Sequence, residues 1–138
     1  MKYLLDTNVL SEAVKTHPEK NVMAMLKKYE EEIVTASPVW HELQFGCRRL
    51  PQSTKKKIIS SFLKDVVLKS IPILPYNADA AELHAGERAR LSLKGETPSF
   101  VDGQIASIAI SNDLILVTRN TSDFIKFKNI KLENWHKA

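Results

Sequence analysis

The sequence is poor in the residues and segments on which several classes of protein depend. Cys47 is the one cysteine among 138 residues, which excludes an intramolecular disulfide and a cysteine zinc site and favours a reducing, cytoplasmic location. The four histidines lie far apart and form no H-x-x-x-H pair. No apolar run reaches the roughly 18 residues that cross a membrane, and Asp6 interrupts the N-terminal apolar run before a signal-peptide core forms. We therefore expect neither a membrane protein nor a secreted, disulfide-stabilised one.

The charge of the chain is basic and unevenly distributed. Lys and Arg number 20 against 16 Asp and Glu, a formal net charge of +4. The whole excess lies in residues 1–70, which hold 12 basic and 8 acidic side chains. A hydrophobic share of 43% with 26% charged residues is typical of a folded, soluble chain, and the length fits a single domain over 1–138. The basic first half permits an anionic partner such as nucleic acid but does not establish one.

Short apolar runs alternate with amphipathic segments along the chain, which predicts an α/β fold. This alternation is typical of a central parallel sheet, here of about four to five strands, flanked by helices on both faces. Two prolines in the third strand place it at a sheet edge. Strands are expected at 2–5, 33–36, 71–75, 114–117 and 130–132, and helices at 9–14, 21–32, 37–49, 53–68, 79–93 and 99–112.

Polar residues predict where the helices begin. Ser37 followed by Pro38 reads as an N-cap and a first helical position. Asp79 is expected to open its helix through a capping box with Glu82, and Ser99 is expected to cap the helix that follows. These assignments fix which side chains lie in the first turn of each helix.

Four carboxylates fall near strand ends: Asp6, Glu42, Asp102 and Asp123. Because the carboxyl ends of parallel strands meet at one edge of a sheet, Asp6, Glu42 and Asp123 are expected to lie together there. Asp102 joins them only if its helix begins at that edge, which the order helix-then-strand does not guarantee.

A plain structural role competes for each acid, because carboxylates commonly cap helices. Two placements count against it. Glu42 is too far into its helix to cap and lies within an apolar stripe, and Asp102 shares a face with Ile105 and Ala106, with no Lys or Arg one turn away. Burying uncompensated carboxylates is costly. The simplest compensator is a hard divalent cation, Mg²⁺ or Mn²⁺, which prefers oxygen ligands.

Taken in order, four motifs resemble those of PIN-domain ribonucleases. They are Leu4-Leu5-Asp6-Thr7-Asn8-Val9-Leu10, Glu42-Leu43-x-x-Gly46, Asp102-x-x-Ile105-Ala106-x-x-Ala109 and Val117-Thr118-x-Asn120-x-x-Asp123-Phe124. Each is weak alone, but all four in this order, in a domain of this length, are specific. The resemblance covers essentially the whole chain, and the length and spacing are most similar to the VapC toxins of bacterial toxin–antitoxin pairs.

This resemblance implies a three-layer PIN-like fold, a site for one or two Mg²⁺ or Mn²⁺ ions, and endonucleolytic cleavage of RNA. It also implies a homodimer and a small antitoxin protein that blocks the site. By the resemblance, the catalytic and metal-binding residues are Asp6, Glu42, Asp102 and Asp123, the last binding either directly or through water. The polar residues that would support them are Thr7, Asn8, Thr118 and Asn120.

The metals would lower the pKa of a bound water and neutralise the phosphate, so products with a 5′-phosphate and a 3′-hydroxyl are expected. Arg119, Arg48 and Arg49 are candidate RNA contacts, and Arg49 lies seven residues after Glu42 on the same helix. Lysines 55–57 could also contact RNA, but a solvated, charged helix face explains them at least as well. Trp40, Phe45 and Cys47 are expected in the core, although the aromatic pair would also suit base stacking. Apolar faces on helices 21–32 and 53–68 suit an antitoxin helix or a dimer contact.

Other functions fit the sequence less well. A receiver domain needs an aspartate after the third strand, where Tyr76 and Asn77 stand, and a D-x-D phosphatase needs an aspartate at Asn8. Four glycines without a cluster exclude a glycine-rich phosphate loop. A non-catalytic RNA-binding or regulatory module of the same fold remains the alternative.

Overall fold

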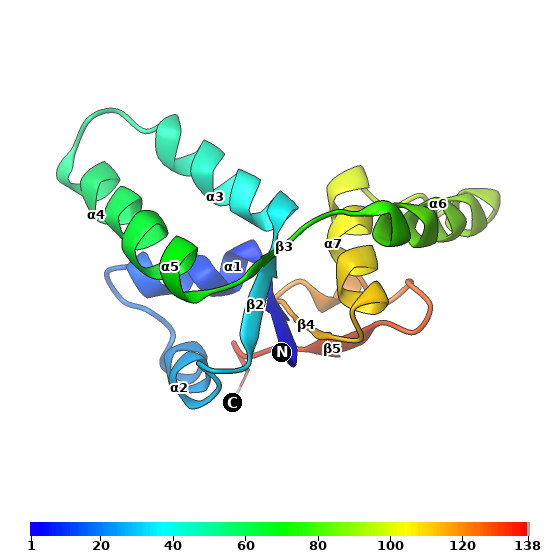
Figure 1. Cartoon of the computed structure of the whole chain (residues 1–138), viewed down its shortest axis with the longest axis horizontal. Helices are drawn as coiled ribbons and strands as arrows, with labels where there is room; N and C mark the ends of the chain where they lie inside the picture. The colour runs from blue at the N-terminus through cyan, green and yellow to red at the C-terminus, as the bar shows by residue number, and fades with distance from the viewer. Residues whose placement is uncertain (138) are drawn as a thin grey trace.

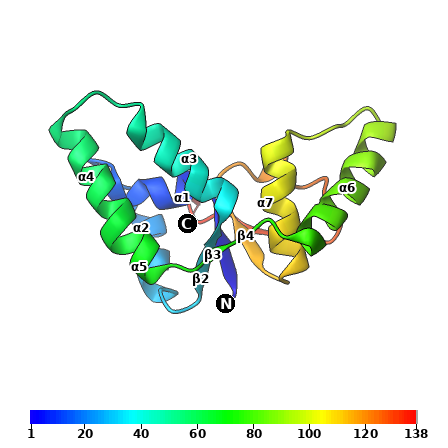
Figure 2. The ribbon, with the colours of Figure 1, turned by 45° about the horizontal axis from the view of Figure 1, so that its top comes forward.

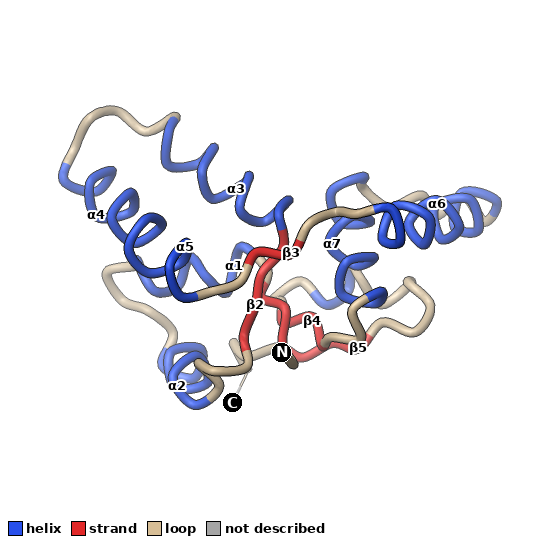
Figure 3. Tube along the Cα trace, in the orientation of Figure 1, coloured by secondary structure: helices blue, strands red, loops and turns tan. Residues whose placement is uncertain are grey.

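A five-stranded parallel sheet forms the centre of the protein, for which the computed structural model describes residues 1–137. The strand order is β3-β2-β1-β4-β5, so the third strand lies at an edge as its prolines predict (Figure 3). The predicted parallel α/β fold is confirmed. The strands are β1 (Tyr3–Leu5), β2 (Ile33–Ala36), β3 (Ile73–Leu74), β4 (Ile115–Val117) and β5 (Lys131–Glu133).

The middle of the sheet is buried on both faces. Tyr3 pairs with Ile33 on one side and with Ile115 on the other, and all three residues of β1 are buried. Parallel strands covered on both faces are continuous apolar runs, which is why β1 reads as Tyr-Leu-Leu. Helices α1–α5 lie to one side of the strands and α6 and α7 to the other, giving three layers (Figures 1 and 2).

The helices follow the predicted segments with shifted ends. The helix predicted over 21–32 ends at Lys28, because three consecutive glutamates, 30–32, would face the negative end of the helix dipole. The helix predicted over 53–68 is interrupted by a wider, π-helical turn from Leu63 to Val67, whose two end residues are buried. The observed helices are α1 (Thr7–Leu10), a 3-10 turn (Ser11–Val14), α2 (Lys20–Lys28), α3 (Ser37–Arg48), α4 (Thr54–Phe62), α5 (Leu68–Ser70), α6 (Ala78–Leu93), α7 (Phe100–Ser111) and a 3-10 turn (Thr121–Asp123).

Two of the three predicted caps are wrong. Ala36, and not Ser37, is the N-cap of α3, and no side chain caps that helix. Asn77 caps α6 by accepting a 3.0 Å bond from the N–H of Ala80, so the helix begins one residue before Asp79. Ser99 caps α7 as predicted: its hydroxyl accepts a 3.1 Å bond from the N–H of Asp102. That bond orients the first turn of the helix that carries Asp102.

Of the three residues of α3 expected in the core, two lie there. Cys47 is buried and Trp40 packs against the core, as predicted. Phe45 is 57% exposed, so its assignment to the core is wrong. It lies on α3 opposite the buried face that carries Val39 and Cys47. Within residues 1–137, none of the helices has the length and apolar character needed to cross a membrane.

Candidate acidic site

Asp6 lies at the carboxyl end of the central strand and is 7% exposed. One carboxylate oxygen, Oδ1, accepts a 2.8 Å bond from the N–H of Thr7, so Asp6 also caps α1. The other, Oδ2, accepts a 2.8 Å bond from the hydroxyl of Thr118, which follows β4. Burial raises the pKa of Asp6 above its usual range and the charge of Glu42 adds to this, while the hydrogen bonds oppose it. Asp6 thus lies between β1 and β4, where the direction of the strand order reverses and ligands bind in such folds.

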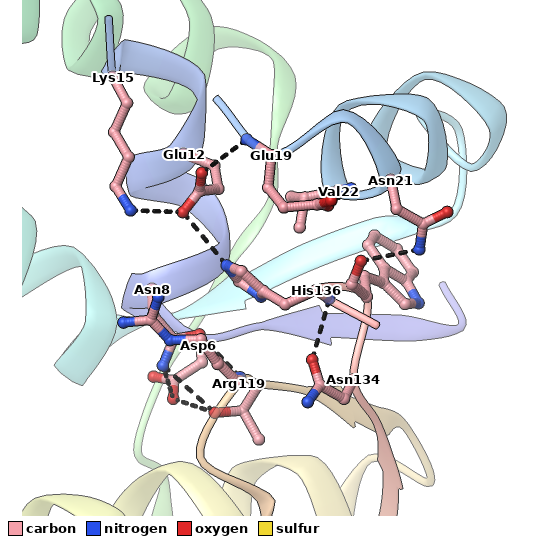
Figure 4. Close-up of polar contacts among 12 residues, drawn as sticks. Asp6, Asn8, Glu12, Lys15, Glu19, Asn21, Val22, Arg119, Asn134 and His136 are labelled. Carbon is pink, nitrogen blue, oxygen red and sulfur yellow. Dashed lines mark hydrogen bonds and ion pairs between the residues drawn. The ribbon is translucent and has the colours of Figure 1, made fainter. Parts of the chain in front are cut away.

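The predicted supporting residues form one hydrogen-bond network around Asp6 (Figure 4). The amide nitrogen of Asn8 lies 3.4 Å from both Asp6 Oδ2 and the Thr118 hydroxyl. The amide oxygen of Asn8 accepts a 3.0 Å bond from the N–H of Arg119. Asn120 contributes through its backbone N–H, which donates to the Thr118 hydroxyl at 3.1 Å. The network fixes the segment after β4 against the segment after β1.

Glu42 is joined to the same site through Thr7. The Thr7 hydroxyl donates a 2.8 Å bond to Glu42 Oε2. Glu42 is half-buried on α3, six residues into the helix, and so it cannot be a capping residue. The structure therefore places Glu42 with Asp6, as the strand-end argument predicts.

Asp102 and Asp123 lie near Asp6 as well. Burial raises the pKa of Asp102, and the negative charges of Asp123 and Asp6 raise it further. The helix α7 therefore begins at the acidic edge of the sheet, a condition that the sequence left open. Asp102 and Asp123 also line one pocket of about 340 Å³ together with Ser99, Ser122 and Lys126. Asp123 is exposed, whereas Asp102 is half-buried.

The four acids converge without a balancing cation. Within residues 1–137, none of them forms an ion pair with Lys, Arg or His. In the same described part of the chain, no group of three His, Cys, Asp or Glu side chains is close enough to enclose a metal ion directly. The charge of Glu42 acts on Asp6, and those of Asp123 and Asp6 act on Asp102, so the acids repel one another in neighbouring pairs.

The predicted arginines occupy two different places. Arg119 is exposed beside the Asp6 network. Arg48 is exposed on α3 and donates to Gln44 at 3.3 Å, while the Arg49 guanidinium lies 5.3 Å from the centre of the Phe45 ring. Lys56 donates to the carbonyl of Leu50 at 3.0 Å, just beyond the C-terminus of α3. It therefore has a structural role at the end of that helix.

Two features of the site were not predicted. Ser122 and Lys126 line the pocket of Asp102 and Asp123, and their only signal in the sequence is proximity to Asp123. His84 is 2% exposed and packs its ring against Gly103, the residue after Asp102, while its Nδ1 lies 2.7 Å from the Tyr76 hydroxyl. A lone histidine on an amphipathic helix gives no sign of such a contact.

Residues 3–130 match the family model described as the PIN domain. The chain belongs to the PIN domain family. Ribonuclease VapC2 of Rickettsia felis is 34% identical over 99% of this chain and 100% of its own length. Toxin FitB of Neisseria gonorrhoeae is 31% identical over 96% of this chain and 98% of its own length. The crystal structure of VapBC2 from Rickettsia felis bound to a DNA fragment from its promoter superposes with a TM-score of 0.83 at 33% identity, covering 98% of this chain and 99% of that one.

Proposed function

We propose that this PIN-domain chain is a metal-dependent endoribonuclease and the toxin of a toxin–antitoxin pair. The observation that carries the proposal is the convergence of Asp6, Glu42, Asp102 and Asp123 on one edge of the sheet. The full-length similarity to a ribonuclease and to a toxin of the same fold supports it. A chain with these acids and with a basic first half suits cleavage of an RNA phosphodiester bond by water.

The donor set fits Mg²⁺ or Mn²⁺. Its four candidate ligands are all carboxylates, the donors that hard cations prefer. The raised pKa values of Asp6 and Asp102 reflect burial and mutual repulsion, both of which a divalent cation would relieve. Because no three of these side chains within residues 1–137 are close enough to enclose an ion, an ion bound here would keep several waters, as Mg²⁺ usually does. Asp6 and Glu42 would hold it on one side, and Asp102 and Asp123 on the other.

Residues of the chain orient the carboxylates and contact the substrate. When bound, the metal supplies the charge that activates water and neutralises the phosphate. The hydroxyls of Thr118 and Thr7 donate to Asp6 and Glu42 and so hold both carboxylates in place. Ser99 fixes the first turn of α7 and with it Asp102. Arg119, which is exposed beside this network, would bind a phosphate next to the one that is cleaved.

The proposal includes an antitoxin protein and a homodimer as partners and RNA in the cytoplasm as substrate. An apolar pocket of about 200 Å³ opens beside Glu42 and Thr7 and is lined by Leu43, Ile59 and Phe62 among others. An amphipathic antitoxin segment that fills it would reach the acids and inhibit the enzyme. The VapBC2 structure supports this pairing, because the relative there was crystallised as a complex.

Cleavage of RNA by matched variants tests the function. We expect the wild type to cut RNA with Mg²⁺ or Mn²⁺ and to leave a 5′-phosphate, while Asp6→Ala and Asp102→Asn lose about 100-fold or more. Asp113→Asn is the control, since Asp113 is an exposed acid paired with Lys131, and asparagine tolerates its positive φ of 54°. Equal activity of all variants, or a 2′,3′-cyclic phosphate product, contradicts the proposal. If the protein binds RNA but shows no cleavage that is lost in the acid variants, the non-catalytic alternative is favoured.

A further inference from the structure

The outer face of α3 carries three planar groups at successive helical turns. They are His41, Phe45 and Arg49, which we call the α3 ladder. The rings of His41 and Phe45 are nearly parallel, with 13° between their planes and 6.4 Å between their centres. The Arg49 guanidinium lies 5.3 Å from the centre of the Phe45 ring, and all three residues are exposed. Three exposed planar groups in a row can stack with a flat ligand that adds to them.

The charge around the ladder selects an anionic ligand. Residues 43–64, which span the second half of α3, all of α4 and the loop between them, contain six Lys and Arg and no Asp or Glu. Apart from Glu42 itself, the ladder thus lies in a stretch of the chain that has no acid until Asp65. A ligand that combines planar faces with negative charge is a nucleic-acid strand.

The ladder also leads to the acidic site. At 3.6 residues per turn, Arg49 lies within about 20° of Glu42 around the helix axis, and Phe45 within about 60°. The α3 helix runs from the edge of the sheet outward (Figure 1), with Glu42 midway along it and Arg49 as its C-cap at the outer end. A strand with a phosphate at Glu42 would pass along the ladder as it leaves the site.

We propose that the α3 ladder binds unpaired nucleotides of the RNA substrate by base stacking, on the strand that leaves the acidic site past Glu42. This inference rests on the proposed function. Bases in a duplex have both faces covered, so the ladder selects single-stranded loops or ends over paired RNA. Phe45 supplies the stacking surface, and Arg49 both stacks and neutralises a phosphate.

Binding of a short unstructured RNA oligonucleotide in EDTA tests the ladder apart from cleavage. By fluorescence anisotropy we expect Phe45→Ala to weaken binding about 10-fold and Phe45→Trp to restore it, because stacking on an aromatic side chain tolerates a change of ring. Quenching of 2-aminopurine in the oligonucleotide reports the stacking itself and should be lost with Phe45→Ala. Leu93→Ala is the control, since Leu93 is a 91% exposed apolar side chain on α6.

The salt dependence of binding tests Arg49. Arg49→Ala should reduce the slope of log K against log salt by about 0.7, the value for one phosphate contact on a single strand. Lys28→Ala is the matched control, because Lys28 lies 5.2 Å from the Tyr29 ring on the distant helix α2. An unchanged slope for Arg49→Ala overturns the phosphate contact.

Further outcomes separate base stacking on the ladder from a contact between two copies of the chain. Failure of the wild type to bind the oligonucleotide, or equal affinity of Phe45→Ala, overturns the ladder even if the enzyme cleaves RNA. If Phe45→Ala instead splits a dimer in sedimentation experiments and leaves RNA binding of the monomer unchanged, the face is a contact between two copies and the inference is wrong. If RNA binding depends on Phe45 but the protein never cleaves RNA, the nuclease proposal is contradicted and the inference about the α3 ladder still holds.

Discussion

The Thr7 hydroxyl donates a 2.8 Å hydrogen bond to Glu42 Oε2, and the N–H of the same residue donates a 2.8 Å bond to Asp6 Oδ1. One residue therefore sets the distance between carboxylates that come from β1 and α3. Thr7 contributes no charge to the site, yet it fixes how two charged groups meet.

Replacing the Thr7 hydroxyl tests this role. Thr7→Val keeps the shape and removes the donor, so we expect Mn²⁺ affinity to fall about 10-fold, as is typical when a residue that orients a metal ligand is removed. Isothermal titration calorimetry measures it. Thr7→Ser retains the donor and should bind Mn²⁺ nearly as the wild type does. A Thr7→Val protein with normal affinity would show that Glu42 needs no such support.

Neutralising Asp102 should stabilise the protein when no divalent ion is present. Its pKa is raised by burial and by the charges of Asp123 and Asp6, so the ionised form opposes folding above that pKa. The free energy of unfolding of the wild type should rise as the pH falls through the raised pKa toward the unfolded value of about 3.9. Asp102→Asn should raise Tm at pH 7 by a few degrees, at the expense of activity.

Thermal unfolding in EDTA between pH 7 and pH 4 measures the effect of Asp102. The gain from Asp102→Asn should shrink as the pH falls. Asp113→Asn should have the opposite sign, because Lys131 holds the pKa of Asp113 below its usual range. A lower Tm for Asp102→Asn at pH 7 would mean that its carboxylate makes a stabilising contact.

Glu12 should make the protein sensitive to acid. Burial alone would raise the pKa of this 2% exposed carboxyl, but hydrogen bonds from Lys15, the N–H of Glu19 and His136 outweigh it and hold the pKa at about 2 (Figure 4). Its stabilising contribution is complete above the unfolded pKa of about 4.3 and is lost as the pH falls toward 2. Glu12→Gln should therefore lower the free energy of unfolding at neutral pH by about 2 kcal/mol.

Urea unfolding at pH 7 and pH 3 measures the contribution of Glu12. The difference between the wild type and Glu12→Gln should be smaller at pH 3. Asp65→Asn is the control, since Asp65 forms an exposed pair with Lys69 at 3.9 Å, and such pairs contribute little. A difference that does not depend on pH would assign the effect of Glu12 to packing.

The contact of His84 with Gly103 predicts a pair of compensating substitutions. A Cβ at Gly103 would overlap His84 Nε2, so Gly103→Ala should cost about 1–3 kcal/mol through overpacking. Adding His84→Ala makes room and should recover part of that loss relative to His84→Ala alone. Gly46→Ala is the control: its Cβ meets nothing within 4 Å on α3, and it should stabilise by about 0.5–1 kcal/mol. Additive losses in the double variant would contradict the contact.

Much of the fold and the acidic site follows from local patterns in the sequence. The strands are apolar runs, and Asp6 and Glu42 follow β1 and β2, so parallel pairing alone brings them to one edge. The direction of α7 was not predictable, because whether Asp102 reaches that edge depends on the preceding loop, not on the periodicity of the helix. The exposure of Phe45 was missed because an aromatic residue on an amphipathic helix is usually buried.

The errors in the helix starts have a similar cause. Asn77 and Asp79 are both good capping residues two positions apart, and the backbone conformation decides between them. The wide turn at 63–67 leaves no mark on the sequence, because its buried residues fit an ordinary helix almost as well. These features depend on tertiary packing, which local patterns do not contain.

The position of β1 in the sheet has a consequence for biosynthesis. β1 is made first but lies in the middle, and one of its two neighbours, β4, is made near the end of the chain. The hydroxyl that holds Asp6 comes from Thr118, and Asp123 follows it. A nascent chain on the ribosome therefore carries Asp6 for most of its synthesis without the partners that organise the site. The acidic site is therefore complete only once translation has passed these residues.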